Sequence, residues 1–310
     1  MNELEWFVKI SGNTGSDPGL VQGTGGNLSV KLGGNMMIKS SGVRMDAVTD
    51  GSGWSVVDHG KIAGIYGGSF DEAVADSVVA SSVIKGGRPS IETGFHSFLG
   101  KYVVHLHPVH LNAVLCCKNS AGMLSEIFRE EEFLWIPYVK VGHRLAAEIK
   151  KRRRNEGIIF LENHGIIASS DDPYECMNII SSVGTRVYNY LMSRIPSFKP
   201  FSYTAPKQEP GRCASTSDSV LRGSSGIFSG FLFPDAVVFS LSEKIKIDTG
   251  GVTYLMDYAN AVNIDGVLAA HAYIKENAAK LGTPKYLTET ETGDITGMES
   301  EKYRRKMVGL

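Results

Sequence analysis

Hydrophobic and polar residues alternate along this chain with two different periods, one that strands produce and one that helices produce. Strand periodicity and short apolar runs lie at residues 28–32, 36–39, 54–58, 102–106, 135–139, 157–161, 165–168 and 236–241. Helical periodicity lies at residues 1–11, 91–99, 109–117, 142–151, 177–191 and 257–280. A Gly-Gly-Asn turn between the first two strands predicts a hairpin. The mixture of elements predicts an α/β sandwich built around a central sheet.

The composition of the chain changes after residue 199. From Pro200 to about Ser225 the residues are mostly Ser, Pro, Thr and Gly, which is typical of a linker or a mobile loop. An apolar strand and a long helix are predicted beyond this segment. We therefore expect a main domain at residues 1–199, followed at 200–310 by a linker and a C-terminal α/β extension of unknown role.

Composition and charge narrow the class of protein. Hydrophobic residues make up 42% of the chain and charged residues 21%, which is typical of a folded globular protein. The 32 basic residues nearly balance the 33 acidic ones, so we expect no nucleic-acid partner. The chain shows neither a signal-peptide pattern nor an apolar run long enough for a membrane span, so a cytoplasmic location without membrane attachment is expected. Four cysteines without a C-x-x-C pair indicate buried thiols.

Three histidines form the strongest candidate site. His105 and His107 lie two residues apart on a predicted strand, so both imidazoles point to one face and can bind one ion at ~2.0–2.1 Å. For an isolated pair of this kind, two hydrogen-bonded histidines at a strand end would be the simpler interpretation. His164 precedes another apolar strand, and three ligands with one open position are typical of a catalytic zinc site.

Two other features could contribute to a site beside the histidines. Glu92 begins a predicted helix, where its carboxylate could act as a general acid/base or only favour the helix N-terminus. The turns at 23–29 and 40–42 are rich in Gly and Ser and could direct backbone N–H groups at an anion. Neither turn matches a P-loop or a dinucleotide-binding fingerprint.

Six short motifs occur in an order that identifies a family. They are Gly-Asn-Leu-Ser at 26–29, Ser-Gly at 41–42, Pro-Ser-Ile-Glu at 89–92 with His96, Val-Val-His-Leu-His at 103–107, Pro-Tyr at 137–138 and Asn-His-Gly at 163–165. In this order they resemble the class II aldolase/adducin superfamily, and within it the L-fuculose-1-phosphate aldolases. The resemblance covers about residues 3 to 195.

The resemblance implies a fold and a role for each matching residue. The fold would be a three-layer α/β/α sandwich with a central, mainly antiparallel sheet. His105, His107 and His164 would bind one divalent metal ion per chain, with zinc expected, and Glu92 would be the acid/base. Tyr138 would be the proton donor and would reach the site of a neighbouring subunit in a cyclic homotetramer. The residues that would bind the substrate phosphate are Gly26, Asn27, Ser41, Gly42 and Ser90.

The activity implied by this resemblance is the cleavage of a ketose phosphate through a metal-stabilised enediolate. The same superfamily contains sugar-phosphate 4-epimerases and sugar-acid phosphate decarboxylases, and it contains adducin-like binding modules that lack the metal histidines. Glu92 stands where the epimerases have aspartate, which favours an aldolase. Ile91 replaces a serine of the family pattern and removes one phosphate-binding hydroxyl. The segments 231–235 and 299–305 resemble longer aldolase modules fused to sugar dehydrogenases, and no role is assigned to them.

Overall fold

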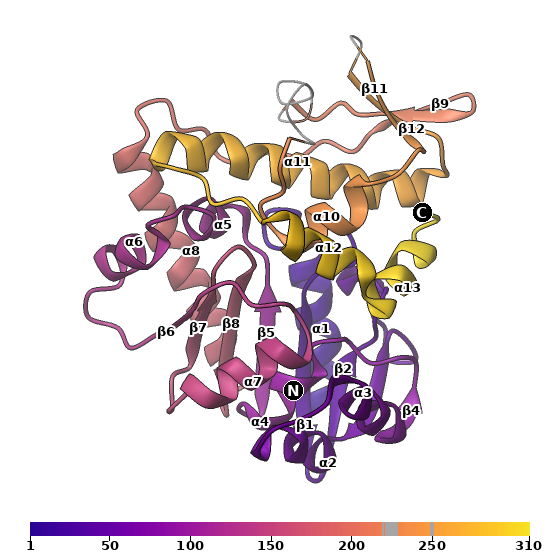
Figure 1. Ribbon diagram of the computed structural model, residues 1–310, viewed down its shortest axis with the longest axis vertical. Coiled ribbons are helices and arrows are strands. Elements are labelled where there is room, and N and C mark those ends of the chain that lie inside the picture. The colour runs from indigo at the N-terminus through magenta and orange to yellow at the C-terminus, as the bar shows by residue number, and fades with distance from the viewer. Residues whose placement is uncertain (219, 221–228, 249–250) are drawn as a thin grey trace.

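An eight-stranded sheet lies at the centre of the computed structural model, which describes residues 1–218, 220, 229–248 and 251–310 (Figure 1). The strand order is β4-β3-β2-β1-β5-β8-β7-β6, and only the β6–β7 pair is parallel. The strands are β1 Asn27–Leu32, β2 Asn35–Lys39, β3 Trp54–Asp58, β4 Val83–Gly86, β5 Tyr102–Leu106, β6 Leu134–Ile136, β7 Ile158–Leu161 and β8 Gly165–Ser170. The expected mainly antiparallel central sheet is confirmed.

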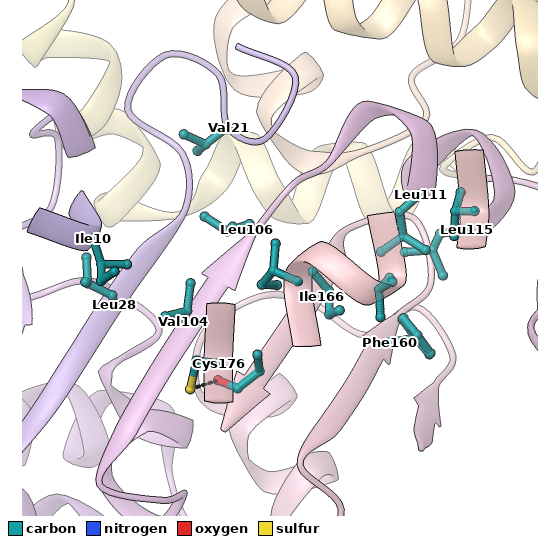
Figure 2. Close-up of a cluster of buried hydrophobic side chains, with 14 of the residues drawn as sticks. Ile10, Val21, Leu28, Val104, Leu106, Leu111, Leu115, Phe160, Ile166 and Cys176 are labelled. Carbon is teal, nitrogen blue, oxygen red and sulfur yellow. Dashed lines mark hydrogen bonds between the residues drawn. The ribbon is translucent and has the colours of Figure 1, made fainter. Parts of the chain in front are cut away.

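Helices cover both faces of this sheet, so the fold has three layers. They are α1 Glu3–Gly15, α2 His59–Gly64, α3 Glu72–Ser81, α4 Thr93–Phe98, α5 Val109–Leu115, α6 Ser120–Ile127, α7 His143–Arg152 and α8 Glu175–Arg194, with short 3₁₀ turns at Met45–Ala47 and Ile65–Gly67. One buried cluster joins the sheet to α1, α5, α6 and α8, and another joins it to α2, α4 and α7. Figure 2 shows part of the first cluster, where side chains of β1, β5, β7 and β8 meet those of α1, α5 and α8.

The strand β5 shows how the sequence pattern produces these layers. Its side chains alternate between the two faces, so Val104 and Leu106 belong to the cluster under α1 and α5 while Val103 belongs to the cluster on the opposite face. His105 lies on the side of Val103, where its ring contacts the edge of Phe95 of α4. The candidate metal ligands therefore lie on the face of the sheet that α4 covers.

The described residues of the C-terminal part form a second, smaller sheet and four helices. Its elements are β9 Lys207–Glu209, β10 Arg212–Ala214, α10 Pro234–Ser240, β11 Ile245–Asp248, β12 Gly251–Tyr254, α11 Tyr258–Leu281, α12 Glu289–Gly297 and α13 Glu299–Met307. The small sheet has the order β11-β12-β10-β9. In Figure 1, α11 crosses above the central sheet and α13 lies close to the C-terminus. The expected C-terminal extension is therefore present, and it contains both helices and strands.

The C-terminal elements share a hydrophobic core with the preceding part of the chain. Side chains of α10, α11 and α12, together with Val308 just after α13, form one buried cluster that also includes Val109 and Cys116, at the two ends of α5. The backbone N–H of Lys285 donates to the carbonyl of Cys116 at 2.7 Å, and the N–H of Lys118 donates to the carbonyl of Thr283 at 2.9 Å. Residues far apart in the sequence are therefore joined at α5.

Two predictions about the C-terminal part differ from the structure. The strand predicted at 236–241 is wrong, because Pro234–Ser240 forms the helix α10. All seven residues of α10 are buried, so their sequence has no polar positions whose period could distinguish a helix from a strand. The feature that does indicate a helix is Pro234, because proline is common at the first helical position. The described part of the predicted linker contains the hairpin β9–β10, and its residues 219 and 221–225 lie outside the described residues.

Candidate functional site

The three candidate histidines meet at one point beside the sheet. The Nε2 atoms of His105 and His107 are 3.0 Å apart, and those of His105 and His164 are 3.3 Å apart. All three residues are buried, and their ligand atoms lie within 4.8 Å of one another. Ligand atoms in a tetrahedral zinc site at ~2.0–2.1 Å from the metal are separated by about 3.3 Å, so the cluster has the dimensions of such a site.

The partners of the other ring nitrogens support metal binding. Nδ1 of His105 lies 2.9 Å from the carbonyl oxygen of Ile166, and Nδ1 of His107 lies 3.1 Å from Oδ2 of Asp235. The carbonyl oxygen of Ile166 only accepts hydrogen bonds, so Nδ1 of His105 carries the proton and its Nε2 presents a lone pair, and the carboxylate beside Nδ1 of His107 favours the same tautomer there. Two lone pairs facing each other at 3.0 Å repel unless a cation lies between them. The donor set therefore fits a divalent metal ion.

Burial keeps the imidazoles in the form that binds metal. Desolvation lowers the pKa of His105, although the nearby Glu92 carboxylate opposes this effect. Desolvation, together with the neighbouring histidines His105 and His107, also holds the pKa of His164 well below its ordinary value. Only the neutral imidazole can coordinate a metal, so both residues are prepared to act as ligands.

The carboxylate of Glu92 points at the histidine cluster. Its Oε2 lies 3.4 Å from Nε2 of His105 and its Oε1 lies 3.5 Å from Nε2 of His164. The side-chain amide of Asn27 donates to Oε2 at 2.7 Å, whereas Oε1 is buried and has no hydrogen-bond partner among the residues that the structure describes. The ring of His96, one turn along α4, is hydrogen-bonded in turn to Asn27. An unpaired carboxylate oxygen at this position can bind the metal or exchange a proton with a substrate.

The small-residue turns lie on the other wall of the same cavity. The cavity is lined by all five residues expected to bind an anion, namely Gly26, Asn27, Ser41, Gly42 and Ser90. It also touches Glu92, His107 and His164. Gly26 has a φ of +61°, and a Cβ atom there would lie only 2.7 Å from Val21, so this turn requires glycine.

Four charged residues of this cavity were not predicted from the sequence as site residues. They are Lys39 at the end of β2, Asp235 of α10, and Glu301 and Arg304 of α13. Desolvation, with the charge of Arg304, lowers the pKa of the buried Lys39 ammonium to about 7. Glu301 and Arg304 are spaced three apart on one helix, which was the only sequence signal that could have paired them.

The cavity is small because the helix α13 lies over it. Its volume is about 40 Å³, whereas sites for small molecules have about 300 Å³ or more. Met307 packs against Gly42, where a Cβ atom would lie 3.0 Å from its Cγ. Two larger cavities adjoin this region, one of about 440 Å³ that shares Ser90 and one of about 290 Å³ that shares Ser41. Both are lined in part by residues of α13.

Tyr138 lies away from the cavity of its own chain. Its ring packs against the C-terminal cluster, and its buried hydroxyl has no hydrogen-bond partner among the described residues. Burial, together with the carboxylates of Glu291 and Asp294, raises the pKa of this hydroxyl above its ordinary value. Within one chain the structure therefore does not bring Tyr138 to the histidines.

Comparison with known proteins identifies the family of the first part of the chain. The family model described as Class II Aldolase and Adducin N-terminal domain matches residues 9–190. The chain is 30% identical over 118 residues to a protein of Bacillus subtilis named uncharacterized oxidoreductase YuxG, a match that covers 37% of this chain and 17% of that protein. The remainder of that longer protein has no counterpart in this match.

Among solved structures, a class II aldolase domain is similar in fold to this chain. The N-terminal class II aldolase domain of a conserved protein from Thermoplasma acidophilum is 22% identical, covers 61% of this chain and 94% of its own, and has a TM-score of 0.55. The L-fuculose-1-phosphate aldolase from Thermus thermophilus is 19% identical, covers 61% of this chain and 93% of its own, and has a TM-score of 0.43. In the part of the chain that the structure describes, no helix combines the length and the apolar run that crossing a membrane requires.

Proposed function

The chain belongs to the class II aldolase and adducin family, and on that premise we propose that it is a metal-dependent aldolase that cleaves a ketose phosphate through an enediolate. The observation that carries the proposal is the convergence of three buried histidines, with the Nε2 atoms of His107 and His164 lying 3.0 and 3.3 Å from that of His105. Beside them lies Oε1 of Glu92, which no described residue hydrogen-bonds. We propose residues 1–199 as the catalytic domain and 200–310 as its extension. The family match, which ends at residue 190, supports this division.

In the proposed reaction, a bound cation and the side chains of the protein have separate roles. A divalent cation held by His105, His107 and His164, with zinc the ion we propose, would supply Lewis-acid chemistry by balancing the negative charge that develops on the substrate oxygens. Glu92 moves the proton, because its Oε1 faces the cluster and is not hydrogen-bonded to any part of the chain that the structure describes. Asn27 fixes the other oxygen of this carboxylate, so Glu92 presents a single basic atom.

The anionic end of the substrate is proposed to bind at the small-residue turns. Gly26, Asn27, Ser41, Gly42 and Ser90 would supply backbone and side-chain donors there. Lys39 lines the same wall, where its side chain donates to backbone carbonyls of these turns. Because the cavity holds only about 40 Å³, substrate entry requires α13 to move from Gly42, which would join the cavity to its larger neighbours.

The nearest alternatives use the same metal site for another reaction. The segment from Ile38 to Gly42 resembles the Ile-Lys-Pro-Ser-Gly motif of the 4-epimerases, and its Lys39 lines the cavity. Glu92 stands where those enzymes have aspartate, and we therefore favour the aldolase. A sugar-acid phosphate decarboxylase would need the same metal and the same anion site. An adducin-like binding module would need neither.

A substrate panel distinguishes these activities. Metal-loaded protein is incubated with ketose phosphates and sugar-acid phosphates, and the products are assayed for a three-carbon phosphate, for CO₂ and for a changed configuration. We expect release of a three-carbon phosphate from a ketose phosphate. Release of CO₂ or epimerisation without cleavage would replace the aldolase with one of its alternatives. Metal-loaded protein that converts no member of the panel would favour the binding module.

Tyr138 is proposed as the proton donor for the site of a neighbouring subunit in a cyclic tetramer. In one chain its hydroxyl is buried against the C-terminal cluster, so this role requires that cluster to open in the assembly. If Tyr138 acts between subunits, Glu92→Gln and Tyr138→Phe proteins are each nearly inactive, whereas their co-expressed hybrids contain some sites with both native residues. We expect the hybrids to regain part of the activity. Hybrids as inactive as their parents, or an active monomer, would make Tyr138 a packing residue.

A further inference from the structure

A chain of buried charges connects the C-terminal helix α13 to one of the candidate metal ligands. Nη1 of Arg304 lies 2.9 Å from Oε2 of Glu301, and its Nη2 lies 2.7 Å from Oδ1 of Asp235. The other oxygen of Asp235 lies 3.1 Å from Nδ1 of His107. The side chains of these four residues are between 2% and 12% exposed, so water screens their interactions only weakly.

From these contacts we infer that Asp235, held in place by Arg304, positions His107 for metal binding. The C-terminal extension would then contribute directly to the affinity of the site for its metal. This inference rests on the proposed metal site. A carboxylate on the second nitrogen of a metal-binding imidazole selects the tautomer, orients the ring and increases the basicity of the ligand nitrogen. Asp235 is therefore a positioning residue, and Arg304 acts through it.

Charge and space at Asp235 agree with this role. The guanidinium of Arg304, 2.7 Å from Oδ1, balances the charge of the buried Asp235 carboxylate. The glycine-rich turn leaves room for the carboxylate, because a Cβ atom on Gly25 would lie 2.4 Å from Oδ2. The carboxylate of Asp235 thus occupies the space that a side chain at residue 25 would fill.

A second ligand is connected to the extension by independent contacts. Asn163, which precedes His164, has a φ of +56°, a conformation that L residues seldom adopt. Its side-chain amide donates to the carbonyls of Leu232 at 2.7 Å and Lys285 at 2.6 Å, both in the extension. The loop that presents His164 is therefore held from the same side as His107. Metal binding and docking of the extension should consequently stabilise each other.

The chain offers a matched pair of arginines for the test. Arg305 follows Arg304 on α13 and also binds α10, through the carbonyls of Val238 and Leu241, but it does not contact Asp235. Arg305→Gln therefore removes two hydrogen bonds of α13 and leaves the contacts among Glu301, Arg304, Asp235 and His107 intact. The dissociation constant for zinc is measured by competition with a chromophoric chelator in the full-length wild type and in the Asp235→Asn, Arg304→Gln and Arg305→Gln variants.

We expect Asp235→Asn and Arg304→Gln to bind zinc about 10–100-fold more weakly, the usual effect of losing such a partner, and Arg305→Gln to bind within about twofold of the wild type. Equal weakening in both arginine variants would mean that α13 acts only by docking. Wild-type affinity in folded Asp235→Asn protein would overturn the inference and leave the proposed metal site standing. Failure of the wild type to bind zinc would instead contradict the proposed function.

A measurement on the wild type alone guards against variants that fail to fold. Amide hydrogen exchange is compared between metal-stripped and zinc-loaded protein over α10 and α13. We expect slower exchange in both helices when zinc is bound, because the metal fixes His107 and hence Asp235. Exchange in α13 that does not respond to zinc would contradict the inference.

Discussion

The His107→Ala protein is expected to lose its tightly bound divalent metal and all measurable aldol cleavage. Nε2 of His107 lies 3.0 Å from Nε2 of His105, so removing the ring leaves two ligands on one side of an open site. The loss also leaves the buried carboxylate of Asp235 facing a vacant space. We expect the affinity for zinc to fall by more than the ~100-fold that the loss of an outer partner causes.

The metal content of purified, zinc-reconstituted protein provides the measurement for this variant. The wild type should hold one ion per chain, and His107→Ala should hold much less. His59→Ala is a suitable control, because His59 lies outside the cavity and bonds to the backbone carbonyls of Ser97 and Gly33. A His107→Ala protein that retains one ion per chain, or a control that loses the ion, would show that the metal binds elsewhere.

The Glu92→Gln protein should keep the metal and lose turnover by ~10²–10⁴-fold, the usual effect of removing a general acid/base. Glutamine has the same shape and can still accept the hydrogen bond from Asn27, so the fold of the site is retained. It cannot accept a proton at the position of Oε1, which is the atom that faces the cluster without a partner.

Turnover and metal content are measured together to separate catalysis from assembly. Glu72→Gln provides the control, because Glu72 is a half-exposed carboxylate that bonds to Lys140 and Arg144 outside the cavity. Near-normal turnover in Glu92→Gln would return Glu92 to a purely structural role at the start of α4. Loss of the metal with the activity would instead assign the carboxylate to metal binding.

The three histidine ligands could be predicted from the sequence, because two of them are close together on one strand and the third belongs to an ordered set of family motifs. The two-residue period of β5 places His105 and His107 on one face, and the structure confirms that their Nε2 atoms meet. The position of His164 could not follow from spacing, because it depends on the pairing of β5 with β8, which joins His105 to Ile167. The ordered family motifs supplied that information.

The charged residues from the extension could not be predicted, because their place depends on tertiary packing. Asp235 begins a helix whose residues are all buried, so its sequence has no polar face to mark it. Arg304 lies in a helix that contains many acidic and basic residues, which is typical of a solvent-exposed helix. The side chain of Arg304 is nevertheless only 12% exposed. Only the docking of α10 and α13 against the family domain brings both residues to the histidines.

The most direct test of the central claim is a titration of metal-stripped protein with zinc, in which release of a three-carbon phosphate from the best ketose phosphate is followed with each addition. We expect no cleavage by stripped protein, activity that rises in proportion to bound zinc, and a break at one ion per chain. Cleavage at full rate by stripped protein, or zinc-loaded protein that remains inactive on every ketose phosphate, would contradict the proposed function.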